Sequence, residues 1–492
     1  MTRPTLSLLA AAVCFPGCVA PEKPIVPPVD VASGFTPLPG APLPDQWWRS
    51  FDDPILNRLV DQALDDNFDL AAAWDRLRQA REVARIETAE LLPDLEGRGG
   101  ASRSRRVESF EGRPASGAPG DTGSEGGTRV TLTTNYNLGL EISYELDLWG
   151  RIRASRDAAV FDTRASAEDV RTAALTLAAS VADTWVQLVE QNAQVDLLEA
   201  QLELNQQVTD LVTTRFRQGQ VGSLDVLQQR QLTESRRGDI ALARAQAAIF
   251  EHQLAILLGQ PPTRSVAPRV ADLRLPGPLP STGLPAALVQ RRPDVRSSYY
   301  AILATDRRVW EAIADRLPRI SLTAGADANA ESIRDLLDNY LATLAANFIA
   351  PLLDGGARAA EVRRVRAVLS ERINLYGQTI LEAFGEVQDA LVQERQQRIF
   401  LASINKQLEL SSAALRRIRQ GYLQGTNDYL RVLDAISTEQ ELQRTQLAAR
   451  RSLLQQRILL CRALGGSWEM QSPPLKRLVS IPAESQPAPA LP

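Results

Sequence analysis

The chain has 492 residues, a net charge of −4, 44% hydrophobic residues and 23% charged residues. That length fits two or three ordinary domains or one large repetitive one, and the near-neutral charge excludes the basic surface of a nucleic-acid-binding protein. His252 is the only histidine, and Cys461 is the only cysteine beyond the first eighteen residues. A Cys/His zinc site or a Ser–His–Asp triad is therefore not expected. We predict no catalytic residues, no metal site and no enzyme activity.

Residues 1–17 predict a bacterial lipoprotein signal peptide. Arg3 precedes an apolar run, residues 6–15, that is too short to span a membrane as a helix. Gly17-Cys18 resembles a lipobox, in which the cysteine is acylated and becomes the mature N-terminus, although the two residues before Gly17 depart from the usual pattern. We therefore expect a covalent lipid on Cys18 and no other cofactor, with ordinary cleavage nearby as the alternative. Val19, in place of an aspartate, favours the outer membrane.

A proline-rich tether, residues 18–46, follows the signal. It holds eight prolines, which remove backbone donors and favour an extended chain. Beyond the tether the chain divides into a first structural repeat (47–258), a linker (259–283), a second repeat (284–466) and a C-terminal tail (467–492).

Residues 129–148 predict a long β-strand. From Val130 to Leu148 the even positions are mostly hydrophobic and the odd positions are mostly polar, over nineteen residues. An ordinary strand has about five or six residues, and about ten suffice to cross a membrane. A partner strand near 95–106 is inferred from its place in the repeat, because glycine and arginine dominate its own sequence.

Residues 150–258 predict a long helical hairpin. Between Arg151 and Arg217 there is neither proline nor glycine, and a helix of about 65 residues would be roughly 100 Å long. Apolar residues recur every seven positions along it, with Thr209 as a polar gap. A glycine turn at 219–222 then leads into a second, antiparallel helix.

The second half of the chain repeats the first. The segment 215–227 (RFRQGQVGSLDVL) matches 417–430 (RIRQGYLQGTNDYL) at an offset of about 202 residues. The repeat predicts strands near 319–328 and 340–350 and a second helical hairpin at 356–464, whose apolar seam is interrupted by Glu394. A tandem duplication of this kind is expected to fold into two similar units.

Four strands are too few to close a barrel, and a membrane accepts β-structure only when it is closed. Several chains must therefore pool their strands if these segments lie in a bilayer. A soluble four-stranded sheet packed on the helices is the alternative. After the signal we find no apolar run of about 18 residues, so a helical membrane protein is not expected.

Several motifs in order resemble the TolC-like outer-membrane efflux factors, in particular their lipoprotein (NodT) branch. Residues 47–93 resemble the opening block of that branch nearly throughout. The other motifs are YELDLWGRIRAS (144–155), RRPDVR (291–296), PRISL (318–322), PLLDGGAR (351–358) and EAFGEVQDAL (382–391).

The resemblance implies a mixed α and β membrane protein that acts as a homotrimer. Each chain would give four strands to a shared twelve-stranded transmembrane barrel and two long hairpins to a twelve-helix tunnel through the periplasm. The trimer would be a passive exit duct for drugs or other small molecules, docked on a periplasmic adaptor protein and an inner-membrane transporter of the RND class.

The resemblance also implies a periplasmic gate at the hairpin tips. Asp225 and Tyr422 match a family aspartate and tyrosine that are tied across the tips, and Asn427 stands where the family has the arginine of that tie. Asp434 matches one acidic position of the constriction, and Arg431 occupies another. The alternatives are a helix N-terminal role for Asp225, an exposed charge at Asp434 and a side chain at Tyr422 that only covers the seam.

Two other functions stay open from the sequence. The exit duct of a type I protein-secretion system shares the fold. A soluble periplasmic coiled-coil scaffold or adaptor would also contain long helical hairpins, but it would not place residues 130–148 against lipid.

Overall fold

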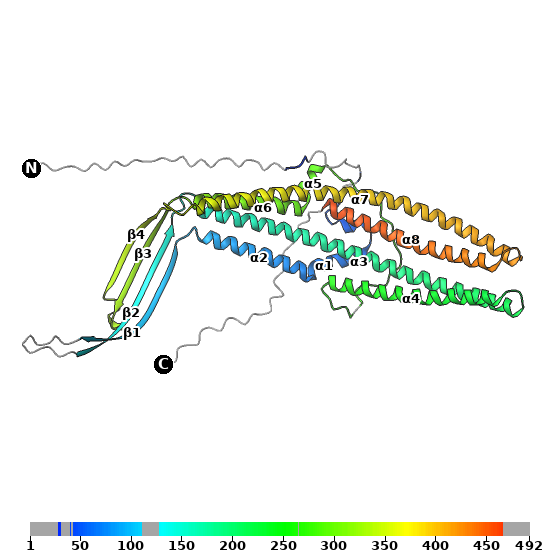
Figure 1. The fold of residues 1–492 in the computed structure, drawn as a ribbon, viewed down its shortest axis with the longest axis horizontal. Coiled ribbons are helices and arrows are strands. Elements are labelled where there is room, and N and C mark those ends of the chain that lie inside the picture. Colours follow the sequence, from blue (N-terminus) through cyan, green and yellow to red (C-terminus); the bar gives the residue numbers. More distant parts are fainter. Residues whose placement is uncertain (1–27, 31–39, 41–42, 111–126, 264, 466–492) are drawn as a thin grey trace, which may run out of the picture.

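The structure is a computed structural model, and it describes residues 28–30, 40, 43–110, 127–263 and 265–465. The predicted signal peptide, Cys18, most of the tether and the C-terminal tail lie outside the described residues. Figure 1 shows a long molecule with a β-sheet at one end and the tips of two helical hairpins at the other.

The sheet contains four antiparallel strands in the order β1-β2-β3-β4. Among the described residues, β1 and β4 are edge strands with one unpaired side each. The strands are β1 (Asp94–Phe110), β2 (Gly127–Glu145), β3 (Arg319–Ala330) and β4 (Tyr340–Ile349). A one-turn 3₁₀ helix, η3 (Ile333–Asp335), lies between β3 and β4.

The strand β2 ends three residues earlier than the sequence pattern predicts, at Glu145 instead of residue 148. The reason is a helix cap. The carboxylate of Asp147 accepts hydrogen bonds from the backbone N–H groups of Ile152 and Arg153, at 3.1 and 3.0 Å. Asp147 thereby satisfies free donors at the start of the next helix and leaves the strand ladder.

The second repeat uses the same device. Asp354 accepts hydrogen bonds from the backbone N–H groups of Gly356 and Arg358, at 2.9 and 3.2 Å. These bonds stabilise the carboxylate and lower the pKa of Asp354. An aspartate just ahead of a glycine with positive φ, Gly150 or Gly356, thus begins each long helix.

Helices make up most of the rest of the described chain, and the largest non-helical segment is the linker between α4 and α5. The two longest, α3 and α7, have 67 residues each and are about 100 Å long. Their hairpin partners α4 and α8 have 35 and 36 residues. The helices are η2 (Trp47–Phe51), α1 (Pro54–Asp66), α2 (Phe68–Ala89), α3 (Arg151–Arg217), α4 (Ser223–Leu257), α5 (Pro285–Arg291), α6 (Pro293–Ala314), α7 (Ala357–Leu423) and α8 (Tyr429–Leu464).

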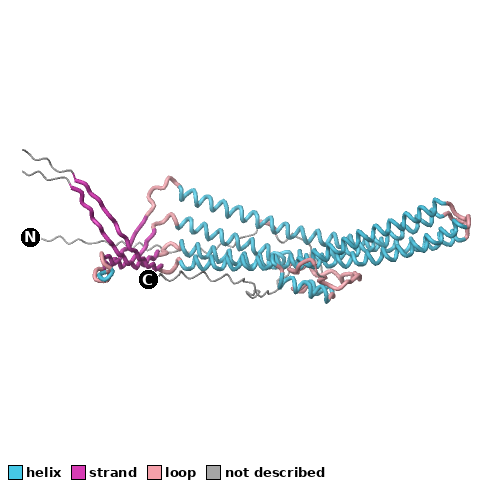
Figure 2. The backbone as a smooth tube through the Cα atoms, turned by 90° about the horizontal axis from the view of Figure 1, so that it is seen from below, coloured by secondary structure: helices cyan, strands magenta, loops and turns pink. Residues whose placement is uncertain are grey.

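The helices form a layer four elements wide along the whole molecule. Near the sheet the order is α2-α3-α6-α7, and towards the tips it is α4-α3-α8-α7 (Figures 1 and 2). The helices α3 and α7 continue through both halves, so α3 lies inside the layer and α7 forms one of its edges. The other edge is α2 and then α4.

The largest hydrophobic core lies where the short N-terminal elements meet the long helices. Trp47 and Trp48 are fully buried there. The indole N–H of Trp185, on α3, donates to Asp53 at 2.7 Å, and Asp53 also caps α1. This packing fixes the N-terminal elements against α3.

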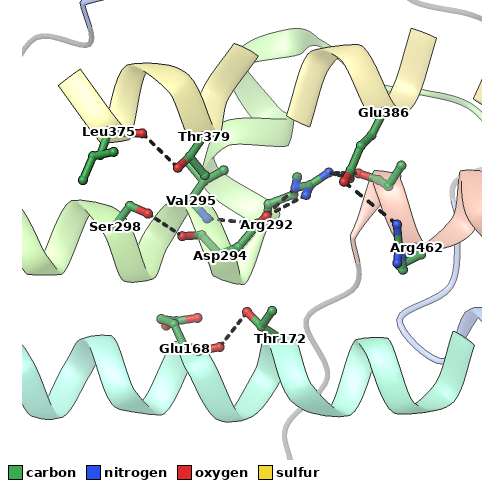
Figure 3. A network of polar contacts seen from close by, with 11 residues as sticks. Glu168, Thr172, Arg292, Asp294, Val295, Ser298, Leu375, Thr379, Glu386 and Arg462 are labelled. Atoms are coloured by element: carbon green, nitrogen blue, oxygen red, sulfur yellow. Dashed lines mark hydrogen bonds and ion pairs between the residues drawn. The ribbon is translucent and has the colours of Figure 1, made fainter. Parts of the chain in front are cut away.

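A polar network joins the second-repeat helices at the same level, as Figure 3 shows. Arg292, just before α6, bonds to Asp294 at 2.6 Å, to Glu386 of α7 at 2.7 Å and to the carbonyl of Ala463 at the end of α8 at 3.1 Å. Glu386 also lies 3.9 Å from Arg462. One arginine thus holds three helices together.

By length and composition, α3 contains a stretch that is apolar enough to cross a membrane, and 61% of that stretch is buried inside the protein. The expectation that no such run follows the signal is wrong for this helix. The helix packs against α2, α4, α6 and α8 and buries many alanines and valines, so burial in the helix layer accounts for its apolar character.

Candidate gate at the hairpin tips

Both hairpin tips are built around a glycine with positive φ. Gly219 (φ 71°) follows α3, and Gly425 (φ 75°) follows α7. This left-handed conformation costs glycine least, so the chain can leave one helix and enter the next within a few residues. Asp428 then caps α8, and its carboxylate accepts from the backbone N–H of Arg431 at 3.0 Å.

A small hydrophobic cluster joins the two tips, and we call it the tip cluster. It combines side chains from the first hairpin with side chains from the second, so each tip buries apolar surface of the other. Its members are Val212, Val226, Leu415, Tyr422, Tyr429, Val432 and Ile436.

Tyr422 is buried in this cluster, where its ring meets side chains of both hairpins. The guanidinium of Arg215, on α3, lies 4.5 Å from the centre of its ring, a cation–π contact between the two hairpins. The ring of Tyr429 lies 5.9 Å away. The Tyr422 hydroxyl is buried and has no hydrogen-bond partner in the described part of the chain.

Asp225 lies in the first turn of α4 and is half-buried, as its alternative role near a helix N-terminus predicts. It is also close enough to the second hairpin to act on Tyr429. Burial raises the pKa of Tyr429, and the charges of Tyr422 and Asp225 raise it further. Within one chain, the negative charge of Asp225 therefore acts on the Tyr429 hydroxyl.

Asn427 closes its own turn. Its side-chain N–H donates to the carbonyl of Ile418 at 3.2 Å, near the end of α7. A Cβ added at Gly421 would lie 2.3 Å from the Asn427 amide nitrogen, so the glycine leaves room for this bond. Among the described residues of one chain, Asn427 has no hydrogen bond or ion pair with Asp225 or Tyr422.

Arg431 and Asp434 are both exposed on the first turns of α8. Among the described residues neither side chain has an ion pair, and the backbone carbonyl of Asp434 accepts from the Thr438 hydroxyl at 2.9 Å. Their charges are therefore free to act on ions or on other chains near the tip.

The hydroxyl of Tyr429 makes a bond between the hairpins that the sequence did not predict. It donates to the side-chain carbonyl of Gln229 on α4. The amide N–H of Gln229 in turn donates to the backbone carbonyl of Asn205 on α3 at 2.8 Å. Tyr429 thus fastens the start of α8 to both helices of the first hairpin.

Farther from the tips than this bond, a layer of buried polar side chains lies between the hairpins. The side chains of Asn205 and Gln440 exchange hydrogen bonds of 3.4 and 3.1 Å, and Arg236 donates to Gln440 at 3.2 Å. The one signal in the sequence was the polar gap at Thr209, whose hydroxyl lies 3.0 Å from that of Thr233. Buried polar groups of this kind specify one register when all are paired.

Glu394, which interrupts the sevenfold apolar seam of α7, is also a buried polar site. It is fully buried and pairs with Arg457 at 2.6 Å and Arg398 at 2.9 Å. Arg457 also donates to the carbonyls of Gly277 and Pro278. The triad therefore fastens the linker between the repeats to α7 and α8.

At the opposite end of the molecule, the sheet presents one apolar face that no helix covers (Figures 1 and 2). The strand register places the even residues of β2, such as Leu140, on this face together with Leu344 and Phe348 of β4. Leu344 is 83% exposed. The alternative of a soluble sheet packed on the helices is therefore wrong.

In the described residues no three His, Cys, Asp or Glu side chains gather as a metal site would require. The arrangement consists of an apolar ribbon at one end, a long helical layer and a polar, tyrosine-lined contact between tips at the other. Such a structure is suited to forming part of the wall of a tube.

Comparison with known proteins agrees with this architecture. The family model described as outer membrane efflux protein matches residues 59–260 and 284–466. The chain is 32% identical to the pyoverdine export outer membrane protein OpmQ of Pseudomonas putida, over 96% of this chain and 100% of that protein. It is 30% identical to the toluene efflux pump outer membrane protein TtgI of Pseudomonas putida, over 85% of this chain and 87% of that protein.

Solved structures show the same fold. The transmembrane channel protein CusC has a TM-score of 0.76 at 26% identity, over 90% of this chain and 97% of that chain. The outer-membrane channel OprN has a TM-score of 0.76 at 27% identity, over 89% and 96%. The family predicted from the sequence motifs is therefore confirmed: this chain belongs to the outer membrane efflux protein family, and its place is the outer membrane.

Proposed function

We propose that three copies of this chain form a passive exit duct that carries small organic molecules across the periplasm and the outer membrane. The observation that carries the proposal is the open layer, four elements wide, that extends from the strands to the hairpin tips. Both of its edges are unpartnered in the described chain. A layer of this kind closes into a tube when copies join edge to edge.

The strands supply the strongest reason for closure. An unpaired backbone N–H or C=O in lipid costs several kcal/mol, and the edge strands β1 and β4 each carry such a row. Eight strands are about the minimum for a barrel, and three chains supply twelve. A β4 edge paired with the β1 edge of the next copy removes every free edge.

The helical edges support the same contact. On α4, Leu242, Ile249 and Ile256 follow one another at seven-residue spacing, and they are 74%, 45% and 61% exposed. The opposite edge, α7, exposes Val392 and Ile399 at the same spacing. Sevenfold apolar repeats of this kind pack helices side by side, so these stripes fit a neighbouring copy.

The cargo and the partners are inferred from the relatives. Relatives that align over most of their length are named for the export of pyoverdine or toluene, which are small molecules. We therefore expect this duct to serve a tripartite efflux pump, with a periplasmic adaptor and an inner-membrane transporter of the RND class. The duct itself needs no catalytic residue and no cofactor, because the transporter supplies the energy.

The tip cluster is proposed as the gate of the duct. Asp225, Tyr422, Asn427, Arg431 and Asp434 all lie at this end, and the contacts of Arg215 and Gln229 hold the two tips together. Opening would be a shift between two packings of the hairpins, driven by a partner that binds the open packing better. The exposed charges of Arg431 and Asp434 would bias which solutes enter.

The lipid on Cys18 is part of the proposal and has its own test. Cells grown with a labelled fatty acid should label the wild-type protein and not a Cys18→Ser variant. Equal labelling of both proteins would contradict acylation at this cysteine.

The function is tested by deleting the gene and measuring the sensitivity of the cells to toxic small molecules. We expect raised sensitivity with unchanged secretion of proteins, and we expect wild-type protein to restore resistance. A Leu242→Glu/Ile249→Glu variant should fail to restore it, because the carboxylates would lie between packed helices. Loss of a secreted protein without a change in sensitivity would instead favour the duct of a type I secretion system.

A further inference from the structure

The strand register locates the membrane on the apolar face of the sheet. At one end of that face lie Tyr136 of β2 and Tyr340 of β4, which pair with neighbouring alanines of β3. At the other end lie Tyr144 and Phe348. Aromatic girdles of this kind mark the two membrane–water interfaces of outer-membrane barrels.

The spacing of the two girdles fits a bilayer. Tyr136 and Tyr144 are eight residues apart, about 26 Å along a strand, or about 20 Å after a strand tilt of about 40°. The apolar band of such barrels is about 25 Å tall. Between the girdles, this face carries only apolar residues and glycines. They are Leu95, Gly97 and Gly99 of β1, Leu138, Leu140 and Ile142 of β2, Leu322, Ala324, Ala326 and Ala328 of β3, and Ala342, Leu344 and Ala346 of β4.

Two arginines lie on the same face just beyond the girdle formed by Tyr136 and Tyr340. Ala101 of β1 pairs with Tyr136, and Arg103 and Arg105 follow it two and four residues later, opposite Thr134 and Leu132. These positions are about 7 and 13 Å past the girdle along the strand. They lie on the side away from the helices, where β1 and β2 continue past β3 and β4 (Figure 1).

The arginines of the polar face are placed differently. Arg98 lies 2.7 Å from Glu141 and 3.1 Å from Glu96, and Arg106 lies 3.6 Å from Glu108. In the described part of the chain no ion pair or hydrogen bond engages the exposed side chains of Arg103 and Arg105. Their partners are therefore to be sought on the lipid side of the barrel.

We propose that Arg103 and Arg105 bind the phosphate groups of a phosphorylated glycolipid in the outer leaflet of the outer membrane. A guanidinium is costly at the membrane centre and tolerated at the interface, so their position beyond the girdle is consistent with the headgroup level. A guanidinium matches a phosphate through two parallel hydrogen bonds. Leu132, opposite Arg105, offers apolar contact beside the pair.

This inference rests on the proposed function, because it requires that the strands cross the outer membrane. Another partner for the arginines would be the acidic loop between β3 and β4 of a neighbouring copy, which carries Asp335 and Asp338. The orientation towards the lipid side favours the glycolipid. The experiment separates the two.

The test compares the binding of lipid A to the full-length protein in nanodiscs, for wild type and for Arg103→Gln/Arg105→Gln. The matched control is Arg106→Gln/Arg129→Gln, which removes two arginines from the polar face of the same strand pair. We expect the dissociation constant for lipid A to rise about tenfold or more in the first variant and to stay unchanged in the control. Dephosphorylated lipid A should bind to wild type as weakly as lipid A binds to the first variant. Inorganic phosphate at about 10 mM should not compete, because the site recognises phosphate held at the membrane surface.

Equal binding by all three proteins, or an equal loss in the control, would overturn the proposal. So would a loss of trimer on unheated gels in the Arg103→Gln/Arg105→Gln variant with lipid A binding unchanged, which would assign the arginines to a neighbouring chain. If the variant reaches the outer membrane as a trimer and binds lipid A as wild type does, the inference fails and the proposed function stands. If wild type itself is not found in the outer membrane, the proposed function fails first.

Discussion

Two tyrosines of the tip cluster, Tyr422 and Tyr429, differ in what their hydroxyls do. The Tyr429 hydroxyl donates to Gln229 across the hairpins, and the Tyr422 hydroxyl has no partner in the described chain. Tyr422 instead contributes its ring, between Arg215 and Tyr429. The two tyrosines therefore contribute one buried hydrogen bond and one cation–π contact to the packing between the tips.

Replacement of Tyr429 by phenylalanine should favour the open packing of the tips. It leaves the Gln229 carbonyl buried without a donor, which costs about 1–3 kcal/mol and shifts the closed-to-open ratio by about tenfold. The measurement is single-channel conductance and open probability in a planar bilayer, where we expect an increase. Tyr422→Phe is the matched control and should behave as wild type. If Tyr422→Phe raised the conductance and Tyr429→Phe did not, the tie through Tyr422 that the family resemblance implies would form between chains in the assembly.

Cys461 should be inert in the folded protein. It is fully buried on α8, and burial raises the pKa of its thiol to about 12, so the reactive thiolate is absent near neutral pH. Iodoacetamide at pH 8.5 should label the Cys461 peptide only after unfolding, whereas a cysteine introduced at exposed Ser235 should react at once. Because the folded-state pKa is raised, the thiol contributes stability that is complete below about pH 9 and is lost as the pH rises towards 12. Rapid labelling of Cys461 in the native protein would contradict its placement.

At the scale of elements, the sequence predicted the strands and hairpins whose own side chains repeat with a regular period. The alternation in β2 and the sevenfold seams of α3 and α7 were sufficient to identify them. The strand β1 has no such pattern, because Gly97, Gly99 and Arg103 replace hydrophobic residues on its lipid face. The sequence therefore predicted β1, near residues 95–106, only from its place in the repeat, and its pairing with β2 confirms the strand.

The contacts between the hairpins could not be predicted from the sequence. Asn205 and Gln440 lie 235 residues apart, and no local pattern records their pairing. The interruptions at Thr209 and Glu394 indicated that something polar lies in each seam, but not which groups it meets. The end of β2 was also predicted too late, because the capping role of Asp147 depends on the backbone geometry at the start of α3.

The buried pair of Glu394 and Arg457, which half-buried Arg398 joins, predicts a large loss of stability when one partner is removed. Glu394→Leu leaves Arg457 buried without a counter-charge, which typically costs about 3–5 kcal/mol. Glu361→Leu on the same helix removes only the exposed pair with Arg364 and should cost less than about 1 kcal/mol. Thermal unfolding of the purified assembly, followed by circular dichroism, measures both. Equal losses in the two variants would contradict the structural role of the triad.

For the molecule as a whole, one face of β2 is assigned to lipid and the other to water. Single cysteines at residues 138, 140 and 142 should place a fluorophore in lipid, and cysteines at 137, 141 and 143 should place it in water. Quenching by brominated lipid should therefore alternate along the strand, and quenching by aqueous iodide should alternate in the opposite phase. Uniform quenching along the strand would contradict the lipid-facing assignment.

In the proposed assembly this chain forms one third of a closed tube. Its sheet and its helix layer are open at both edges in the described structure, and three copies would close them into one barrel and one tunnel. The most direct test is native mass spectrometry of the protein extracted from outer membranes. We expect a particle that contains three chains, and a particle with any other number of chains would show that the tube does not close in this way.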